Sequence, residues 1–223
     1  MIEVAEAGVN RADQTRERLM RAAEHLFAAE GIENVSVRAI LREAGQKNES
    51  ALHYHFVSKA GLIEALQAER VQQVIDLRRE AVDAATADGR EPVVRELCFL
   101  MVDAPFRLCS SDRGFRDFIS VFGQRLVVGN RPVNAHLQAR RDTRLGHINA
   151  LLKRHLPSLE DRLFEMRMES VTRFAMLAMS RRARSGGSFR GKAAQVFVND
   201  LADTMAGILL APVSNETREA LDR

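Results

Sequence analysis

The stretch from Ser36 to Lys59, SVRAILREAGQKNESALHYHFVSK, predicts two short helices joined by a tight turn. The hydroxyl of Ser36 can cap the first helix. One apolar face then follows at helical spacing: Val37, Ile40, Leu41 and Ala44. Gly45 can take the left-handed conformation that ends a helix, and Asn48 or Ser50 can cap the next one. The second helix buries Ala51, Leu52 and Phe56 and turns small or polar residues outward, as a helix that enters a DNA major groove requires.

These residues carry a resemblance to a known family. The run Ala-Gly-x-x-Asn-x-Ser-Ala-x-x-Tyr-His-Phe-x-Ser-Lys-x-x-Leu over residues 44–62, with the preceding segment RLMRAAEHLFAAEG, resembles the DNA-binding signature of the TetR family of transcriptional regulators. The resemblance covers residues 15–66, and beyond them only helical character and length agree. It implies phosphate contacts by Tyr54 and Lys59, and in part by Ser36 and Val37.

Other polar residues of the stretch are candidates for contact with DNA. Arg38, Lys47 and Lys59 can meet phosphates. The expected recognition helix offers further groups to base edges or to the adjoining backbone: Gln46, Lys47, Asn48, Glu49, Ser50, His53 and His55. Asn48 can pair with adenine or merely cap the helix, Lys47 can read guanine or meet a phosphate, and Glu49 can accept from cytosine or repel wrong sequences.

The chain as a whole is predicted to be all-α, with about nine helices. They are expected near residues 13–30, 36–44, 50–56, 59–85, 91–103, 112–128, 132–155, 158–184 and 192–211. Residues 10–60 then form a three-helix DNA-binding domain, and residues 61–215 form a C-terminal domain for effector binding and dimerisation. The long helix from Lys59, which the Ser58 hydroxyl can cap, connects the two.

Composition limits the alternatives. From residue 10 to residue 60 there are eight Lys and Arg against seven Asp and Glu, so phosphate binding must depend on local placement. No long uncharged apolar stretch or signal peptide is visible, and two cysteines are too few for a disulfide framework, so we expect a cytoplasmic protein without a membrane partner. No Gly-x-Ser-x-Gly, Cys-x-x-Cys, His-Glu-x-x-His or phosphate-loop motif occurs, so neither catalysis nor a cofactor or metal is expected. A helical enzyme or a protein-binding scaffold with no DNA role is the alternative.

Phenylalanines in the C-terminal part suggest a ligand site. Most of them are expected to be core, but a helical domain of this family usually encloses a small-molecule cavity, so some should line it. The candidates are Phe99, Met101, Phe106, Phe115, Phe118, Phe122, Phe174 and Met176. Arg107, Arg125 and Arg173 can present a cation, so the effector is expected to be mostly apolar, with an acidic head group as one option.

The last two long helices have more than one apolar side, which favours a two-fold contact with a second copy over complete burial within one chain. Together with the family resemblance, which implies a dimeric regulator, the sequence predicts a homodimeric, ligand-responsive repressor of a palindromic double-stranded DNA operator.

Overall fold

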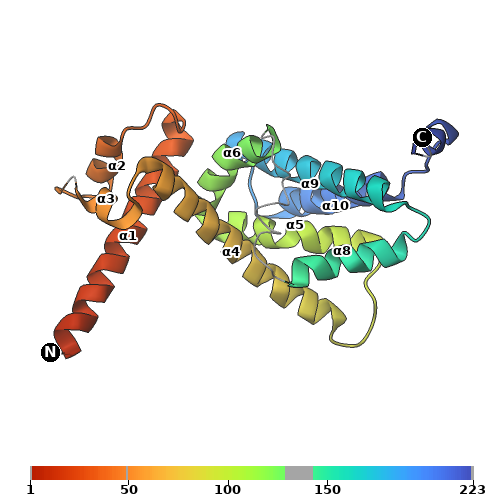
Figure 1. Ribbon diagram of the computed structural model, residues 1–223, viewed down its shortest axis with the longest axis horizontal. Helices are drawn as coiled ribbons and strands as arrows, with labels where there is room; N and C mark the ends of the chain where they lie inside the picture. The colour runs from red at the N-terminus through yellow and green to blue at the C-terminus, as the bar shows by residue number, and fades with distance from the viewer. Residues whose placement is uncertain (1, 49, 129–142, 222–223) are drawn as a thin grey trace.

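The computed structural model describes residues 2–48, 50–128 and 143–221, and side chains within 12–48, 50–123 and 147–221. Ten helices and no strand lie in those ranges, so the prediction of an all-α fold is confirmed. Figure 1 shows a small helical unit at one end of the molecule, a larger bundle at the other, and α4 running between them.

The small unit contains α1 (Ile2–Glu30), α2 (Val37–Glu43) and α3 (Ser50–Phe56), followed by the connecting helix α4 (Lys59–Thr86). Two of the predicted caps are confirmed. The Ser36 hydroxyl accepts from the Ala39 amide at 3.1 Å at the start of α2, and the Ser58 hydroxyl accepts from the Gly61 amide at 3.1 Å at the start of α4. The first helix begins at Ile2, much earlier than the expected residue 13.

The larger bundle contains α5 (Val94–Ser111), α6 (Arg113–Val128), α8 (Thr143–His155), α9 (Asp161–Arg184) and α10 (Lys192–Leu210), and a short α11 (Asn215–Leu221) follows. The sequence did not predict α11. The expected helix over 132–155 is confirmed only in its described part, α8, because residues 129–142 lie outside the described ranges.

The expected helix end at Ala104–Pro105 is wrong, since α5 continues through Pro105 to Ser111. Proline has no amide hydrogen, so the carbonyl one turn earlier, that of Met101, loses its helical donor. The guanidinium of Arg78, on α4, donates to this carbonyl at 2.8 Å. A contact from another helix therefore satisfies the group that the proline leaves open.

One apolar core runs through both parts of the molecule. Where α1 meets α6, the Phe27 ring lies edge-on to Phe122 at 6.4 Å between centroids, and Phe122 stacks on Phe118 at 4.9 Å. Aromatic pairs of this kind contribute about 0.5–1.5 kcal/mol beyond their buried area. The DNA-binding unit is therefore packed directly against α6 and is connected to the bundle by more than α4.

Within the described ranges, no single helix is both long and apolar enough to cross a membrane. Only α10 and α11 taken together pass that test, and they are bent by 64° at the break between them.

Candidate DNA-binding surface

The turn between α2 and α3 is built by Gly45. Its φ of +67° is left-handed, and a Cβ at this position would meet no atom within 4 Å, so backbone conformation alone favours glycine here. The Gly45 amide donates to the Arg42 carbonyl at 3.1 Å and the Gln46 amide to the Leu41 carbonyl at 2.8 Å. These two bonds are those of a Schellman ending, which directs the chain away from α2 toward α3.

At the start of α3, Asn48 acts as a cap. Its Oδ1 accepts from the Ser50 amide at 2.9 Å, so of the two roles the sequence allows, capping is the one seen in the free protein. Lys47, Ser50, His53 and Tyr54 are exposed, and Tyr54 has 79% of its surface accessible. Gln46 is half-buried, and Glu49 lies outside the described residues. The exposed side of α3 therefore carries the groups expected to meet DNA.

His55 does not lie on the exposed side of α3. It is half-buried, its ring lies edge-on to Tyr54 at 4.9 Å between centroids, and Arg16 of α1 is close enough to affect its charge. Burial, and then Arg16, lower the pKa of His55, which favours a neutral ring at neutral pH. Its position indicates support for Tyr54 rather than contact with a base.

Lys59, at the start of α4, is engaged within the protein. Its Nζ donates to the Ile32 carbonyl at 2.5 Å and lies 5.8 Å from the centre of the Phe27 ring. The side chain is half-buried and keeps two further donors. Lys59 thus ties α4 to the loop after α1, a role the sequence did not predict. At the start of α2, Ser36 and Arg38 are exposed and Val37 is half-buried.

Val57, between α3 and α4, has a backbone conformation that its residue type disfavours. Its φ is +64°, and within the described residues it is the only non-glycine residue with a positive φ. A left-handed conformation costs an L-residue about 1–2 kcal/mol, and a β-branched side chain makes it a genuine outlier. Val57 is 71% exposed, so packing does not compensate this cost.

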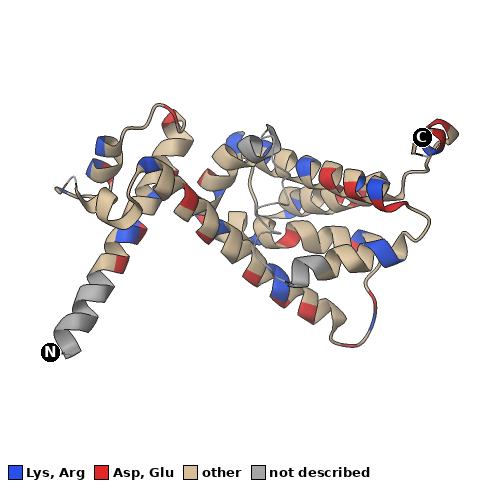
Figure 2. Cartoon of the chain, in the orientation of Figure 1, with Lys and Arg blue, Asp and Glu red and all other residues tan. Residues whose placement is uncertain are grey.

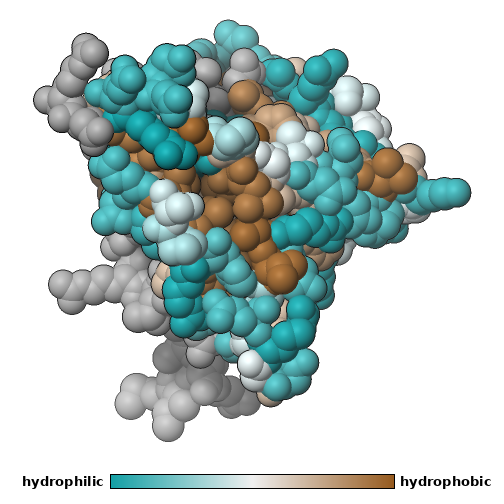
Figure 3. Space-filling view, turned by 90° about the vertical axis from the view of Figure 1, so that its right-hand side faces the viewer, coloured by the Kyte–Doolittle hydropathy of each residue, from teal (hydrophilic) through white to brown (hydrophobic). Residues whose placement is uncertain are grey.

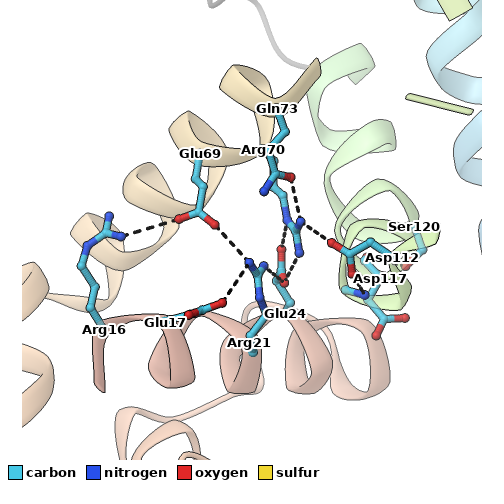
Figure 4. Close-up of polar contacts among 11 residues, drawn as sticks. Arg16, Glu17, Arg21, Glu24, Glu69, Arg70, Gln73, Asp112, Asp117 and Ser120 are labelled. Carbon is cyan, nitrogen blue, oxygen red and sulfur yellow. Dashed lines mark hydrogen bonds and ion pairs between the residues drawn. The ribbon is translucent and has the colours of Figure 1, made fainter. Parts of the chain in front are cut away.

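A buried ion cluster joins the DNA-binding unit to the bundle (Figure 4). Arg70 of α4 is only 1% exposed and binds Glu24 of α1 with two nitrogens, at 2.5 Å and 2.6 Å. Its third nitrogen donates to Asp112, at the α5–α6 junction, at 2.6 Å. Burial alone would lower the pKa of Arg70, but the bonds to Glu24 and Asp112 outweigh it and raise that pKa. One guanidinium therefore connects α1, α4 and the start of α6.

The two halves of this cluster differ in exposure. The Glu24 side chain is 1% exposed and also accepts from Arg21 at 2.9 Å, whereas the Asp112 side chain is 37% exposed. Gly114 makes the close approach possible, because a Cβ there would lie 2.8 Å from both Arg70 and Glu24. Water can reach Asp112 more easily than Glu24. The Arg70–Asp112 pair, at the start of α6, is therefore weaker than the Arg70–Glu24 pair.

The residues predicted to line a ligand cavity do not gather around one site. Phe115, Phe118 and Phe122 are buried where α6 meets α1, and Phe106 is buried against Phe189 at 5.7 Å. Phe99, Met101 and Met176 are half-buried, and Phe174 is exposed. Of the three candidate arginines, Arg107 pairs with Asp103 at 3.7 Å, Arg173 pairs with Glu169 at 2.7 Å, and the side chain of Arg125 lies outside the described residues.

Family models match both the helix-turn-helix unit and the helical bundle. Residues 19–66 match the family model of bacterial regulatory proteins, tetR family, and residues 100–211 match the model of the tetracyclin repressor-like C-terminal domain. Among curated proteins, none matches the chain.

Solved structures share the fold. The fatty acid degradation regulator FadR from Bacillus halodurans is 14% identical with a TM-score of 0.60, and the match covers 89% of this chain and 96% of that one. A TetR-like transcriptional regulator from Rhodococcus sp. RHA1 is 18% identical with a TM-score of 0.51, over 87% and 93% of the two chains. The chain therefore belongs to the TetR family of bacterial regulators, and its helix-turn-helix unit is a DNA-binding unit.

Proposed function

We propose that this protein is a cytoplasmic transcriptional repressor that binds a palindromic operator as a homodimer and is released by a mostly apolar small molecule. The observation that supports DNA binding is the exposed side of α3, with Tyr54 and His53 directed to solvent, next to the exposed Lys47 of the preceding turn. Figure 2 shows further basic residues on α2 and mixed charge along α4, so electrostatic attraction to phosphate comes from local groups.

Apolar exposure on α9 and α10 supports the dimer. Met166, Phe174 and Leu177 of α9 and Val196 of α10 are between 37% and 60% exposed, and all are large apolar side chains. Gly207 of α10 faces open space, where a Cβ would meet no atom within 4 Å. Figure 3, which looks at the molecule from the bundle end, shows a brown apolar area bordered by hydrophilic residues. Surfaces of this kind are typical of subunit contacts.

A groove of about 570 Å³ adjoins this surface, and apolar and basic side chains line it, among them Phe174, Leu177, Phe197 and Arg181. Arg182 is already used within the chain: it donates to the Ser188 carbonyl at 2.6 Å and lies 4.5 Å from the centre of the Phe197 ring. We assign this groove to the contact between two copies, and the arginine-rich segment 181–190 to its border rather than to a second DNA site.

Release follows from the position of the ion cluster. A ligand that displaces α6 separates Asp112 from Arg70, while Glu24 keeps α4 attached to α1. The DNA-binding unit then moves as one body, and the spacing of the two recognition helices changes. Half-sites on B-DNA are about 34 Å apart per turn, so a displacement of a few ångström opposes simultaneous engagement.

Selection of duplexes from random DNA by the purified full-length protein tests the proposal. We expect a palindrome whose half-sites are one helical turn or a multiple apart. The same duplexes should give gel-shift complexes with two chains per site. Recovery of no preferred sequence, or of single half-sites bound by one chain, would contradict it.

A further inference from the structure

Arg78 of α4 differs from the paired arginines around it. Arg70, Arg95 and Arg173 each bind a carboxylate at 2.7 Å or less. For Arg78 the described residues provide one bond, from Nη2 to the Met101 carbonyl, and its Nε is fully buried without a hydrogen-bond partner. Arg116 also has a buried Nε without a partner, but a carboxylate lies near it: burial raises the pKa of Asp117, and Arg113, His25 and Arg116 oppose that rise.

The surroundings of Arg78 are apolar. On α4 the residues one turn away in either direction are Val74, Ile75, Ala81 and Val82. Facing it on α5, the turns around Met101 carry Leu97, Cys98 and Ala104, and the nearest carboxylate of that helix, Asp103, is held by Arg107. Within the described residues, no acidic side chain neutralises this guanidinium.

The charge of Arg78 is nevertheless permanent. Burial lowers its pKa to about 10, which still leaves the side chain protonated at neutral pH. An uncompensated charge in an apolar setting is costly, and an ionisable group perturbed in this way is a candidate for a functional site. The residue as a whole is half-buried, and Nη1, unlike Nε, is not among its buried nitrogens without a partner. A guanidinium binds carboxylates and phosphates through two parallel bonds.

We propose that Arg78 binds the negatively charged head group of an amphipathic organic anion, whose apolar part lies along the α4 and α5 side chains around Met101. The effect of this anion on DNA binding rests on the function proposed above, whereas its binding does not. Arg78 lies eight residues beyond Arg70 on the same helix, or about 12 Å along its axis. An anion at Arg78 therefore acts on the helix that carries the ion cluster.

The first test needs no ligand. If Arg78 is an uncompensated charge, replacement by an apolar side chain of similar length, Arg78→Met, should raise the melting temperature by about 3 °C or more. The control is Arg167→Met. Arg167 of α9 also donates to main-chain carbonyls, those of Leu209 at 2.8 Å and Ala211 at 2.6 Å where α10 ends. Unlike Arg78 it has no buried nitrogen without a partner, so its loss should lower the melting temperature. An Arg78→Met variant that melts as low as Arg167→Met would overturn the proposal, because Arg78 would then only support the Met101 carbonyl.

The second test uses decanoate as anionic probe and 1-decanol as its neutral counterpart, with calorimetry on the full-length protein. Wild type should bind decanoate at least about tenfold more tightly than decanol, Arg78→Lys should keep part of that preference, and Arg78→Met should lose it. Equal preference in wild type and Arg78→Met, or no decanoate binding to wild type at about millimolar concentration, would overturn the proposal. If decanoate binds through Arg78 but no duplex is selected, the anion site stands and the proposed repressor function fails.

Discussion

Lys59 is assigned two roles, and one substitution separates them. The structure places its ammonium against the Ile32 carbonyl and the Phe27 ring, whereas the family resemblance implies a phosphate contact. Lys59→Met keeps the apolar stem and removes the charge. A charged hydrogen bond contributes about 1.5–3 kcal/mol and a cation–π contact about 0.5–1 kcal/mol, and partial exposure reduces both, so we expect a loss of about 2 kcal/mol of unfolding free energy. For a chain of this length the melting temperature should fall by about 4–8 °C.

DNA binding reports the other role. With one phosphate contact per protomer, the slope of log K against log salt should become shallower by about 0.9 for each bound protomer, while sequence preference is kept. The measurement is a salt titration of the selected operator, well below the melting temperature of the variant. Lys47→Met is the control, because Lys47 is exposed and its loss should affect DNA binding without changing the melting temperature.

Each role can fail separately. An unchanged melting temperature in Lys59→Met would refute the assignment of Lys59 as a tether between α4 and the Ile32 loop. An unchanged salt slope would refute the phosphate contact and leave Lys59 a purely internal residue.

Three further predictions concern backbone conformation, assembly and acid stability. Val57→Gly should raise the unfolding free energy by about 0.5–1 kcal/mol in urea titrations, because relief of a left-handed valine exceeds the added entropy of glycine in the unfolded chain; a loss of stability would contradict this. Leu177→Glu should convert the dimer to a folded monomer in sedimentation experiments, since Leu177 is 43% exposed, whereas Leu201→Glu should unfold the chain because Leu201 is 3% exposed; a persistent Leu177→Glu dimer would place the interface elsewhere. Burial tends to raise the pKa of Asp112, but the bond to Arg70 outweighs it, and the folded-state pKa lies below the ordinary value. Asp112 therefore adds stability above about pH 4 that is lost as the pH falls through its folded-state pKa, and the stability of Asp112→Asn should vary less with pH in this acid range; acid unfolding curves of identical shape would refute the linkage.

Local chemistry made the helix-turn-helix unit predictable. A serine cap and a left-handed glycine act within a few residues, so Ser36, Gly45 and Ser58 could be identified from their neighbours alone. Val57 could not be identified in this way, because a β-branched residue is among the least expected at positive φ. Its φ of +64° is visible only in the structure.

Contacts between distant residues account for the other differences. Pro105 signals a helix end, and the helix continues because Arg78, far away in sequence, satisfies the freed carbonyl. The sequence indicated that most of the C-terminal phenylalanines are core residues, but not that Phe27 of α1 packs against Phe122. Arg78 itself was missed because Arg107, Arg125 and Arg173 are equally plausible cations in the sequence, and only the structure distinguishes paired from unpaired guanidinium groups.

If Arg78 binds an anion as proposed, the positions of three cations along α4 would connect ligand binding to DNA binding. Lys59 attaches the helix to the DNA-binding unit, and Arg70 attaches it to α1 and to the start of α6. Arg78 presents a charge that no carboxylate of the described residues pairs, and all three lie within about 30 Å of helix axis. A ligand can shift such an assembly only by as much as it prefers one arrangement over the other, and a tenfold preference corresponds to about 1.4 kcal/mol. The partly exposed Asp112–Arg70 contact is the part of the junction that a preference of this size can most easily break, because the Glu24–Arg70 pair is fully buried. Anion binding at Arg78 should therefore change the angle between α4 and α6 before it disturbs the DNA-binding unit itself.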